Sequence, residues 1–247
     1  MSWRSQHRRG AKQHLSVLLS NVLVIGDIHA PATHPGYMDF VSDMYDQWSC
    51  DRVVFIGDVL DLHAISFHER ELDADNVFGE SQAAIEQVSA WHDTFPNAQV
   101  CIGNHDERVV RKAKTVGIPE VMLKPYAELW QTPTWEWDME FTIDGVRYVH
   151  GTGCSGERPA YNLAAKTMTS TVMGHCHSVA GVSWLCGPKQ TVFGLNVGCG
   201  VDPEHPAMRY GKGWLKRPIL GCGIVNDGMP FFELMDITGT YNRKHFK

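Results

Sequence analysis

The sequence has 247 residues, of which 43% are hydrophobic and 20% charged, and its formal net charge is −6. This composition is that of a globular chain and is too hydrophobic for an extended disordered protein. No run reaches the roughly 20 apolar residues that cross a bilayer, and the net negative charge disfavours a globally basic surface that grips nucleic acid. The first 14 residues form a basic tail with no secretory signal, so we expect a cytoplasmic protein without a membrane partner, whose residues 15–240 form a single domain.

Three β-rich runs in the first half of the chain each end at a glycine followed by a polar residue. They cover residues 17–25, 52–56 and 98–102. Apolar residues at helical spacing predict helices between them, near 36–48 and near 80–93. Such an alternation is typical of βαβ units, whose right-handed crossovers bring the carboxyl ends of parallel strands to one sheet edge. We therefore expect the polar residues after the three runs to converge.

The second half of the chain is predicted to be mainly β-structure after a helical region at about 106–130. Residues 135–143 and 146–149 flank Asp144-Gly145, a dipeptide typical of tight hairpin turns. Further strands are predicted at 171–173, 181–185, 219–225 and 230–235. We expect an α/β fold in which two mixed sheets pack face to face and are flanked by helices, a layered α/β/β/α sandwich.

Five short polar clusters stand at the ends of predicted strands. They are GDIH (26–29), GDVLD (57–61), GNHD (103–106), HG (150–151) and GHCH (174–177). One Gly-Asp pair after a strand is most often only a turn, but five clusters in order point to a common site. The candidate ligands are Asp27, His29, Asp58, Asn104, His150, His175 and His177. A mixed set of imidazole nitrogens and carboxylate or amide oxygens suits Mn, Fe or Zn, and seven ligands suit two ions about 3.5–4 Å apart.

The order and the strand-end positions of these motifs resemble the calcineurin-like metallophosphoesterase superfamily, over residues 22 to about 200. The resemblance implies the calcineurin-like phosphoesterase fold and a binuclear hydrolase in which a hydroxide activated by both ions attacks phosphorus. The cofactors would be two divalent ions, with Mn²⁺ as the first expectation and Fe, Zn or Ni as alternatives. The implied ligands are Asp27, His29 and His177 for the first ion and Asn104, His150 and His175 for the second, with Asp58 as the bridge.

The same resemblance assigns roles beside the ligands. His105 matches the family's catalytic histidine, which donates to a phosphate oxygen or protonates the leaving alkoxide. Asp61 matches a carboxylate that orients this histidine. Leu62 follows it where protein Ser/Thr phosphatases and diadenosine-tetraphosphate hydrolases carry Arg-Gly, so the phosphate-clamping arginine is missing there. Basic residues after GNHD form either a solvated helix face or a contact to a substrate phosphate, for which Arg108 is the best-placed candidate.

These observations favour a metal-dependent phosphoesterase acting on phosphomonoesters or phosphodiesters of small or nucleotide-like molecules. A DNA nuclease resembling the Mre11/SbcD branch is the competing enzyme, although those proteins add capping regions and this chain is short and acidic. A binding module on the same scaffold is the non-enzymatic alternative, and the intact ligand set with His105 argues against it. The expected partner is a phosphate ester, with nucleotides and nucleic acid among the candidates.

Overall fold

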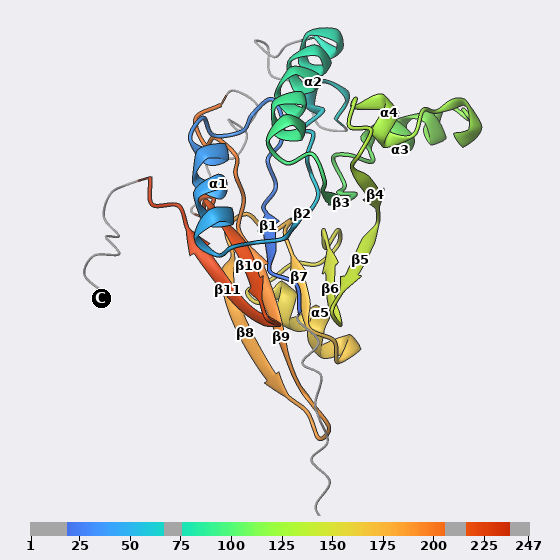
Figure 1. Ribbon diagram of the computed structural model, residues 1–247. Helices are drawn as coiled ribbons and strands as arrows, with labels where there is room; N and C mark the ends of the chain where they lie inside the picture. Colours follow the sequence, from blue (N-terminus) through green and yellow to red (C-terminus); the bar gives the residue numbers. More distant parts are fainter. Residues whose placement is uncertain (1–18, 67–75, 206–215, 238–247) are drawn as a thin grey trace, which may run out of the picture.

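The computed structural model of the chain describes residues 19–66, 76–205 and 216–237 (Figure 1). The predicted basic tail at residues 1–14 therefore lies outside the described residues, and the assignment of residues 15–240 to one domain stays a prediction. In the described part of the chain, the helices are too short or too polar for any of them to cross a membrane.

The described strands form two mixed sheets. The first has the strand order β11-β10-β1-β2-β3-β4, and the second has the order β5-β6-β7-β9-β8. The strands of the first sheet are β1 (Val22–Ile25), β2 (Arg52–Phe55), β3 (Gln99–Cys101), β4 (Glu136–Asp138), β10 (Gly221–Asn226) and β11 (Met229–Leu234). Those of the second sheet are β5 (Glu140–Ile143), β6 (Val146–Val149), β7 (Thr171–Met173), β8 (Ala180–Cys186) and β9 (Thr191–Val197). Strands β1 to β4 run parallel, as do β6, β7 and β9, and the other strands pair antiparallel.

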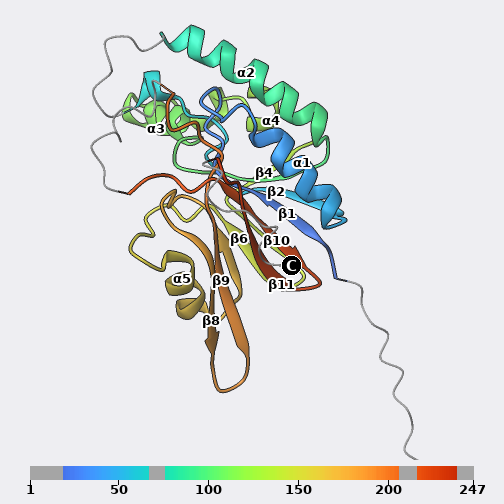
Figure 2. The ribbon, with the colours of Figure 1, turned by 90° about the vertical axis from the view of Figure 1, so that its left-hand side faces the viewer.

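The described helices lie outside the two sheets. They are α1 (Tyr37–Gln47), α2 (Val77–Thr94), α3 (Arg108–Thr115), α4 (Tyr126–Leu129) and α5 (Pro159–Thr167), with 3₁₀ turns η1 (His63–Ile65) and η2 (Glu120–Met122). Helices α1 and α2 pack on the first sheet and α5 packs on β9 and β7 of the second, so the layers follow one another as α, β, β and α (Figure 2). The predicted sandwich of two mixed sheets is confirmed.

Strand β1 is apolar at every position because it is covered on both faces. Leu23 and Ile25 belong to the core beneath α1 and α2, whereas Val22 and Val24 belong to the core between the two sheets. Successive side chains of a strand point to opposite faces, so a strand buried on both sides shows a continuous apolar run. Strand β1 therefore ends in the interior of the molecule. Asp27, two residues after its end, is fully buried.

The predicted strand at 135–143 is divided between the two sheets. Its first part is β4 of the first sheet, its second part is β5 of the other, and Met139 separates them. The alternation of side chains shows that a segment is extended but not which sheet it joins, so the sequence could not reveal this division. The hairpin between β5 and β6 is confirmed, with Asp144 and Gly145 at φ +50° and +79° as a type I′ turn requires.

The helical region predicted at 106–130 is interrupted twice. It consists of α3, η2 and α4, which are separated at Gly117 and by the loops that precede Pro119 and Pro125. Proline has no N–H for the helical hydrogen bond and restricts the residue before it, so each proline starts a new short element. The basic helix after GNHD is therefore only eight residues long.

Candidate metal centre

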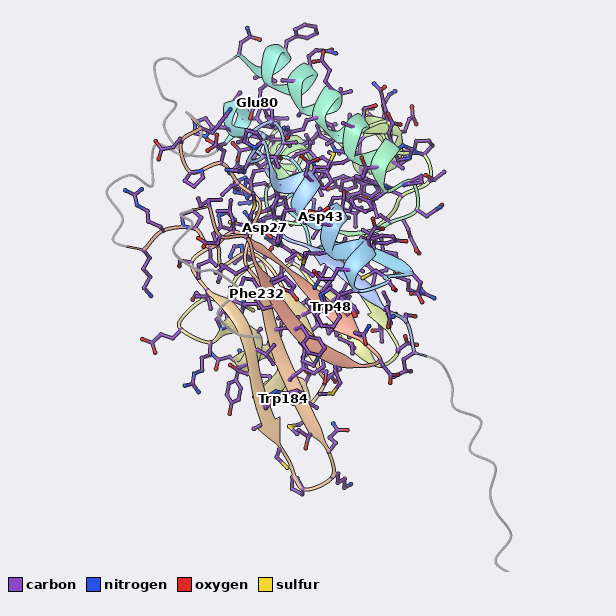
Figure 3. The ribbon with its side chains drawn as sticks, turned by 60° about the vertical axis from the view of Figure 1, so that its left-hand side comes forward. Asp27, Asp43, Trp48, Glu80, Trp184 and Phe232 are labelled. Atoms are coloured by element: carbon purple, nitrogen blue, oxygen red, sulfur yellow. The ribbon has the colours of Figure 1, made fainter. Side chains whose placement is uncertain are left out.

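The predicted clusters meet where the carboxyl ends of five strands lie together. Asp27 follows β1, Asp58 follows β2, Asn104 follows β3 and His150 follows β6, while residues 175–177 follow β7. Asp27, labelled in Figure 3, lies near the middle of the molecule above the strands. The two layers thus both contribute to one site, as the strand-end positions predict.

Asp27, His29 and His177 form one group of candidate ligands, whose ligand atoms lie within 4.8 Å of one another. Asp27 Oδ2 lies 3.0 Å from His177 Nε2 and accepts a hydrogen bond from the backbone N–H of His175, while its buried Oδ1 has no partner among the described residues. His29 Nδ1 lies 3.0 Å from Oδ1 of Asp61, and because a carboxylate only accepts, the Nδ1–H group donates this hydrogen bond. His29 Nε2 is then left with a lone pair, buried and without a partner in the described part of the chain.

Asp58, His150 and His175 form a second group, which Asn104 joins. His150 Nδ1 lies 3.1 Å from the backbone oxygen of Ile56, which can only accept, so the neutral imidazole carries its lone pair on Nε2. This Nε2 atom lies 3.1 Å from Asn104 Oδ1, 3.2 Å from Asp58 Oδ2 and 3.2 Å from His175 Nδ1. With His150 neutral, its Nε2 atom, Asn104 Oδ1 and Asp58 Oδ2 are three acceptor atoms that face one another, and a cation between them removes their repulsion.

The electrostatics of the second group also favour a cation. Burial lowers the pKa of His150, but the carboxylates of Asp58 and Asp27 outweigh burial and raise it to about 10. Burial raises the pKa of Asp58, but His150 and His105 outweigh it and hold it well below its usual range. A metal ion supplies the positive charge that the proton would otherwise bring, because metal ligands bind in their deprotonated forms. Asp58 Oδ2 also lies 3.7 Å from His29 Nε2 of the first group, so Asp58 lies beside both groups of candidate ligands.

His105 and Asp61, which the family resemblance pairs, lie together. His105 Nδ1 lies 3.0 Å from Asp61 Oδ1, and the backbone N–H of His105 donates to Asp58 Oδ1 at 2.8 Å. Burial lowers the pKa of His105, and Asp58 together with the Asp61 hydrogen bond outweighs this and raises it. His105 also falls within 4.8 Å of candidate ligand atoms of His29 and Asp58. Its Nε2, however, lies 3.1 Å from Nη2 of Arg108, and the positive guanidinium would repel an ion at that atom.

Arg108 lies in the wall of the site and not on a solvated helix face. It occupies the first position of α3, is 8% exposed, and donates from Nη1 to the backbone oxygen of Asp61. A guanidinium can only donate, so its contact with His105 requires Nε2 of that ring to accept. No arginine follows Asp61 in the sequence, where Leu62 stands. The guanidinium of Arg108 nevertheless lies beside Asp61 in the structure.

Two motif glycines give the carboxylates room. A Cβ atom on Gly103 would lie 2.2 Å from Asp58 Oδ1, and one on Gly174 would lie 2.1 Å from Asp27 Oδ1. Any side chain at either position would push a candidate ligand out of place. The glycines of GNHD and GHCH are therefore part of the packing around the site and not only turn residues.

Asp106 supports the site, a role that the sequence analysis did not assign to it although it ends the GNHD motif. It is fully buried, and its two carboxylate oxygens accept hydrogen bonds from the backbone N–H groups of Leu60 at 3.0 Å and Gly103 at 2.8 Å. Burial and the nearby charge of Asp58 raise its pKa to about 7. The side chain ties the loop after β2 to the loop after β3, and only the meeting of these loops in space reveals this role.

Glu80 is a second supporting residue that the sequence did not reveal. It lies on α2, is labelled in Figure 3, and accepts from the backbone N–H groups of His63 at 2.5 Å and Ala64 at 2.7 Å. These residues begin η1, directly after Asp61 and Leu62. Burial raises the pKa of Glu80, and the two backbone N–H groups partly offset that rise. The sequence does not predict this contact, because a glutamate in a helix is usually exposed to solvent.

Comparisons with known proteins agree with the motifs. The family model described as calcineurin-like phosphoesterase matches residues 20–198. No curated protein matches the chain. Solved structures with a similar fold include Vacuolar Protein Sorting 29 from Cryptosporidium parvum, at 14% identity over 88% of this chain and 97% of that chain with a TM-score of 0.39. Another is the phosphoesterase Yfce from E. coli, at 14% identity over 83% of this chain and 88% of that chain with a TM-score of 0.37.

Proposed function

Because the chain belongs to the calcineurin-like phosphoesterase family, we propose that it uses two divalent ions to hydrolyse phosphomonoesters or phosphodiesters of small or nucleotide-like molecules. The observation that carries the proposal is the convergence of acceptor atoms around Asp58. Nε2 of His150 and Nε2 of His29 approach the same carboxylate oxygen, at 3.2 Å and 3.7 Å. Burying acceptor atoms against one another without a donor or a cation is costly, and a metal ion at this point would remove that cost.

We divide the candidate ligands between the two ions as the family resemblance implies. Asp27, His29 and His177 would hold one ion, Asn104, His150 and His175 the other, and Asp58 both. When bound, the ions would act as Lewis acids that activate water at neutral pH and offset charge on the phosphate. The nitrogen-rich ligand set is consistent with Mn²⁺, and with Fe, Zn or Ni as alternatives.

His105 is the residue that we propose for proton transfer. Asp61 binds Nδ1 of His105 and fixes the orientation of the ring, so Nε2 faces the site. A protonated His105 would carry its transferable proton on Nε2, from which it can pass to the leaving oxygen of the ester. Asp61 accepts from Nδ1 of both His105 and His29, at 3.0 Å each, and so links the proposed acid to a candidate ligand.

Arg108 is the residue that we propose for phosphate binding. Its guanidinium already lies 3.1 Å from Nε2 of His105 and is anchored on the backbone oxygen of Asp61. Planar guanidinium groups bind phosphate oxygens through paired hydrogen bonds. An incoming phosphate would therefore take over the contact that Arg108 makes with His105 and leave Nε2 of that ring facing the ester.

The test is hydrolysis of p-nitrophenyl phosphate and bis-p-nitrophenyl phosphate by chelator-stripped protein, with and without added Mn²⁺. Metal analysis of the untreated protein accompanies the assay. We expect hydrolysis to return with Mn²⁺ and the untreated protein to carry about two ions per chain, as a two-metal site requires. The ratio of the two rates ranks monoesterase against diesterase activity.

Two results would contradict the proposal. A protein that binds two ions yet hydrolyses neither substrate would favour the binding module, and a protein that binds no ion would remove the basis of the mechanism. Cleavage of single-stranded DNA, with only slow hydrolysis of the small esters, would favour the nuclease instead.

A further inference from the structure

The segment that follows α3 is an exposed arm with apolar side chains at its tip. All nine residues at 114–122 are exposed, and four of them are aliphatic. The exposed fractions are 72% for Val116, 43% for Ile118, 89% for Val121 and 74% for Met122. These are four of the eleven large apolar side chains that are exposed in the described part of the chain. Isolated exposed apolar residues need no explanation, but a group within seven residues does.

The arm is built from regular hydrogen bonds. Gly117 has φ +75°, and the backbone N–H of Ile118 donates to the carbonyl of Ala113 at 2.9 Å, which closes the end of α3. The N–H of Met122 donates to the carbonyl of Pro119 at 3.0 Å and so forms η2. The apolar side chains therefore stand on a formed turn, which projects from the body of the molecule beside the α3 label of Figure 1.

Basic residues precede the apolar tip directly. Arg111, Lys112 and Lys114 lie on α3, and Glu120 is the one acidic residue between 108 and 122. Lys124, after the tip, pairs with Glu128 at 2.8 Å. The protein as a whole has a net charge of −6, so this positive cluster is a local feature of the arm.

We propose that this arm, residues 111–122, docks the protein on the surface of an anionic lipid bilayer. Lysine and arginine attract anionic headgroups, and aliphatic side chains enter the boundary between headgroups and acyl chains. The contact is peripheral, and it revises the expectation that the protein has no membrane partner without requiring a spanning segment.

Other occupants fit the arm less well. Single-stranded nucleic acid is bound by basic grooves with aromatic side chains on which bases stack, and the exposed apolar residues of this tip are all aliphatic. A second copy of the chain would bring the same three basic residues against the first, and like charges across an interface are unfavourable. An anionic bilayer accounts for both the charge and the aliphatic tip.

The position of the arm connects it to the candidate metal centre. Arg108, at the start of α3, contacts His105, and an eight-residue helix is about 12 Å long. Docking through the far end of α3 would hold the centre close to the lipid surface. The docking itself does not depend on hydrolysis, so it can be tested whether or not the proposed function is correct.

The experiment is co-sedimentation of the full chain with vesicles of phosphatidylcholine alone and of phosphatidylcholine mixed with phosphatidylglycerol. We expect binding only to the anionic vesicles, with an affinity that falls as salt is added. Met122→Ser should weaken binding at least about tenfold, whereas Met229→Ser, at a 50% exposed methionine on β11, should not. Lys114→Glu should weaken it at least about fivefold, whereas Lys166→Glu, on α5, should not.

Several results would overturn the proposal. These are no binding to anionic vesicles, equal binding to neutral vesicles, or unchanged binding by Met122→Ser and Lys114→Glu. Light scattering that shows a dimer dissociated by Met122→Ser, without vesicle binding, would make the arm an interface between copies. Binding of single-stranded DNA that Lys114→Glu abolishes, without vesicle binding, would make it a nucleic-acid surface.

Discussion

The loops after the strands of the first sheet and those after the strands of the second sheet contribute to the candidate centre in different ways. The first-sheet loops are bound to one another. Asp58 accepts from the backbone N–H of His105, and Asp106 accepts from the backbone N–H groups of Leu60 and Gly103. We call these first-sheet loops, residues 56–61 and 103–106, together with Asp27, the frame. Hydrogen bonds to the buried carboxylates of Asp58 and Asp106 hold the backbone of the two loops in place without any ion.

The second-sheet loops are positioned by atoms of that frame. His150 Nδ1 lies 3.1 Å from the carbonyl oxygen of Ile56, while His175 N and His177 Nε2 both lie within 3.0 Å of Asp27 Oδ2. The His177 side chain is 21% exposed, whereas the carboxylates of the frame are buried. The comparison indicates that the first sheet supplies rigidity and shared charge, and the second supplies imidazoles that depend on it. Loss of the Asp58 carboxylate, which both groups of candidate ligands approach, should therefore disturb both ions, and loss of an imidazole of the second-sheet loops only one.

The largest effect is expected from Asp58→Asn, which removes the shared negative charge while keeping an oxygen for the His105 N–H. We expect both ions to be lost and Mn²⁺-dependent hydrolysis to fall more than about 100-fold, beyond the usual effect of a residue that only supports a ligand. Metal analysis and turnover of p-nitrophenyl phosphate measure the two losses. Asp43→Asn, at an exposed aspartate of α1 labelled in Figure 3, is the matched control. Full metal content in Asp58→Asn would contradict the shared role.

His105→Ala separates catalysis from metal binding within the frame. We expect both ions to remain and turnover to fall about 10²- to 10⁴-fold, the usual contribution of a positioned proton donor. His92→Ala on α2, whose histidine contacts Thr134 outside the centre, should leave turnover unchanged. If His105→Ala emptied the site, His105 would be a ligand and its proposed role would be wrong.

His177→Ala tests whether a second-sheet loop affects one ion alone. Its Nε2 atom lies 3.0 Å from Asp27 Oδ2, its ring packs edge-on against that of His29, and its side chain is partly exposed. We expect metal content to fall from about two ions to about one, as a two-metal site that loses one ion predicts, while the free energy of unfolding of the chelator-stripped protein stays unchanged. Loss of both ions would mean that the two groups of ligands are not independent.

Asp106→Ala tests the rigidity of the frame itself. The change leaves two buried N–H groups, of Leu60 and Gly103, without their acceptors. Each such loss costs about 1–3 kcal/mol, so urea unfolding of the chelator-stripped protein should show a loss of at least about 2 kcal/mol. Asp106→Asn, which keeps an acceptor oxygen, should lose less. Equal stability of wild type and Asp106→Ala would show that these hydrogen bonds do not hold the loops.

The smallest effect concerns Glu80, which holds η1 beside the frame. Its pKa is raised by burial, so the folded state retains the proton more strongly than the unfolded state, whose glutamate pKa is about 4.3. The stability that this group contributes is complete below about pH 4.3 and is lost as pH rises through the folded pKa. Relative to Glu80→Gln, chelator-stripped wild type should therefore become less stable as pH rises above about 4. Parallel pH profiles of the two proteins would contradict this.

The sequence predicts the polar residues of the centre because strand ends are visible in it. An apolar run that stops at Gly-Asp places Asp27 and Asp58 after β1 and β2, and crossover handedness then brings them to one edge. It does not predict backbone contacts between distant loops, such as the one that fixes His150 on Ile56. Nor does it reveal the left-handed backbone of His29, at φ +48°, because that conformation is imposed by neighbours and not favoured by the residue.

The fold shows the same division between what the sequence pattern predicts and what only the packed structure reveals. The continuous apolar run of β1 is typical of a strand buried on both faces, but the division of 135–143 between the sheets follows from tertiary packing alone. Likewise, the basic residues after GNHD are visible in the sequence, whereas the burial of Arg108 against His105 and the exposure of Met122 are not. The local hydrophobic pattern therefore predicts where strands and helices lie along the chain. Tertiary contacts between loops decide which side chains are buried and what they bind.

The most direct test of the account is anomalous diffraction from crystals of the protein grown with Mn²⁺. We predict two peaks, one beside Asp27, His29 and His177 and the other beside Asn104, His150 and His175, with Asp58 in contact with both. A single peak, peaks elsewhere in the molecule, or a bond from His105 to either ion would contradict it.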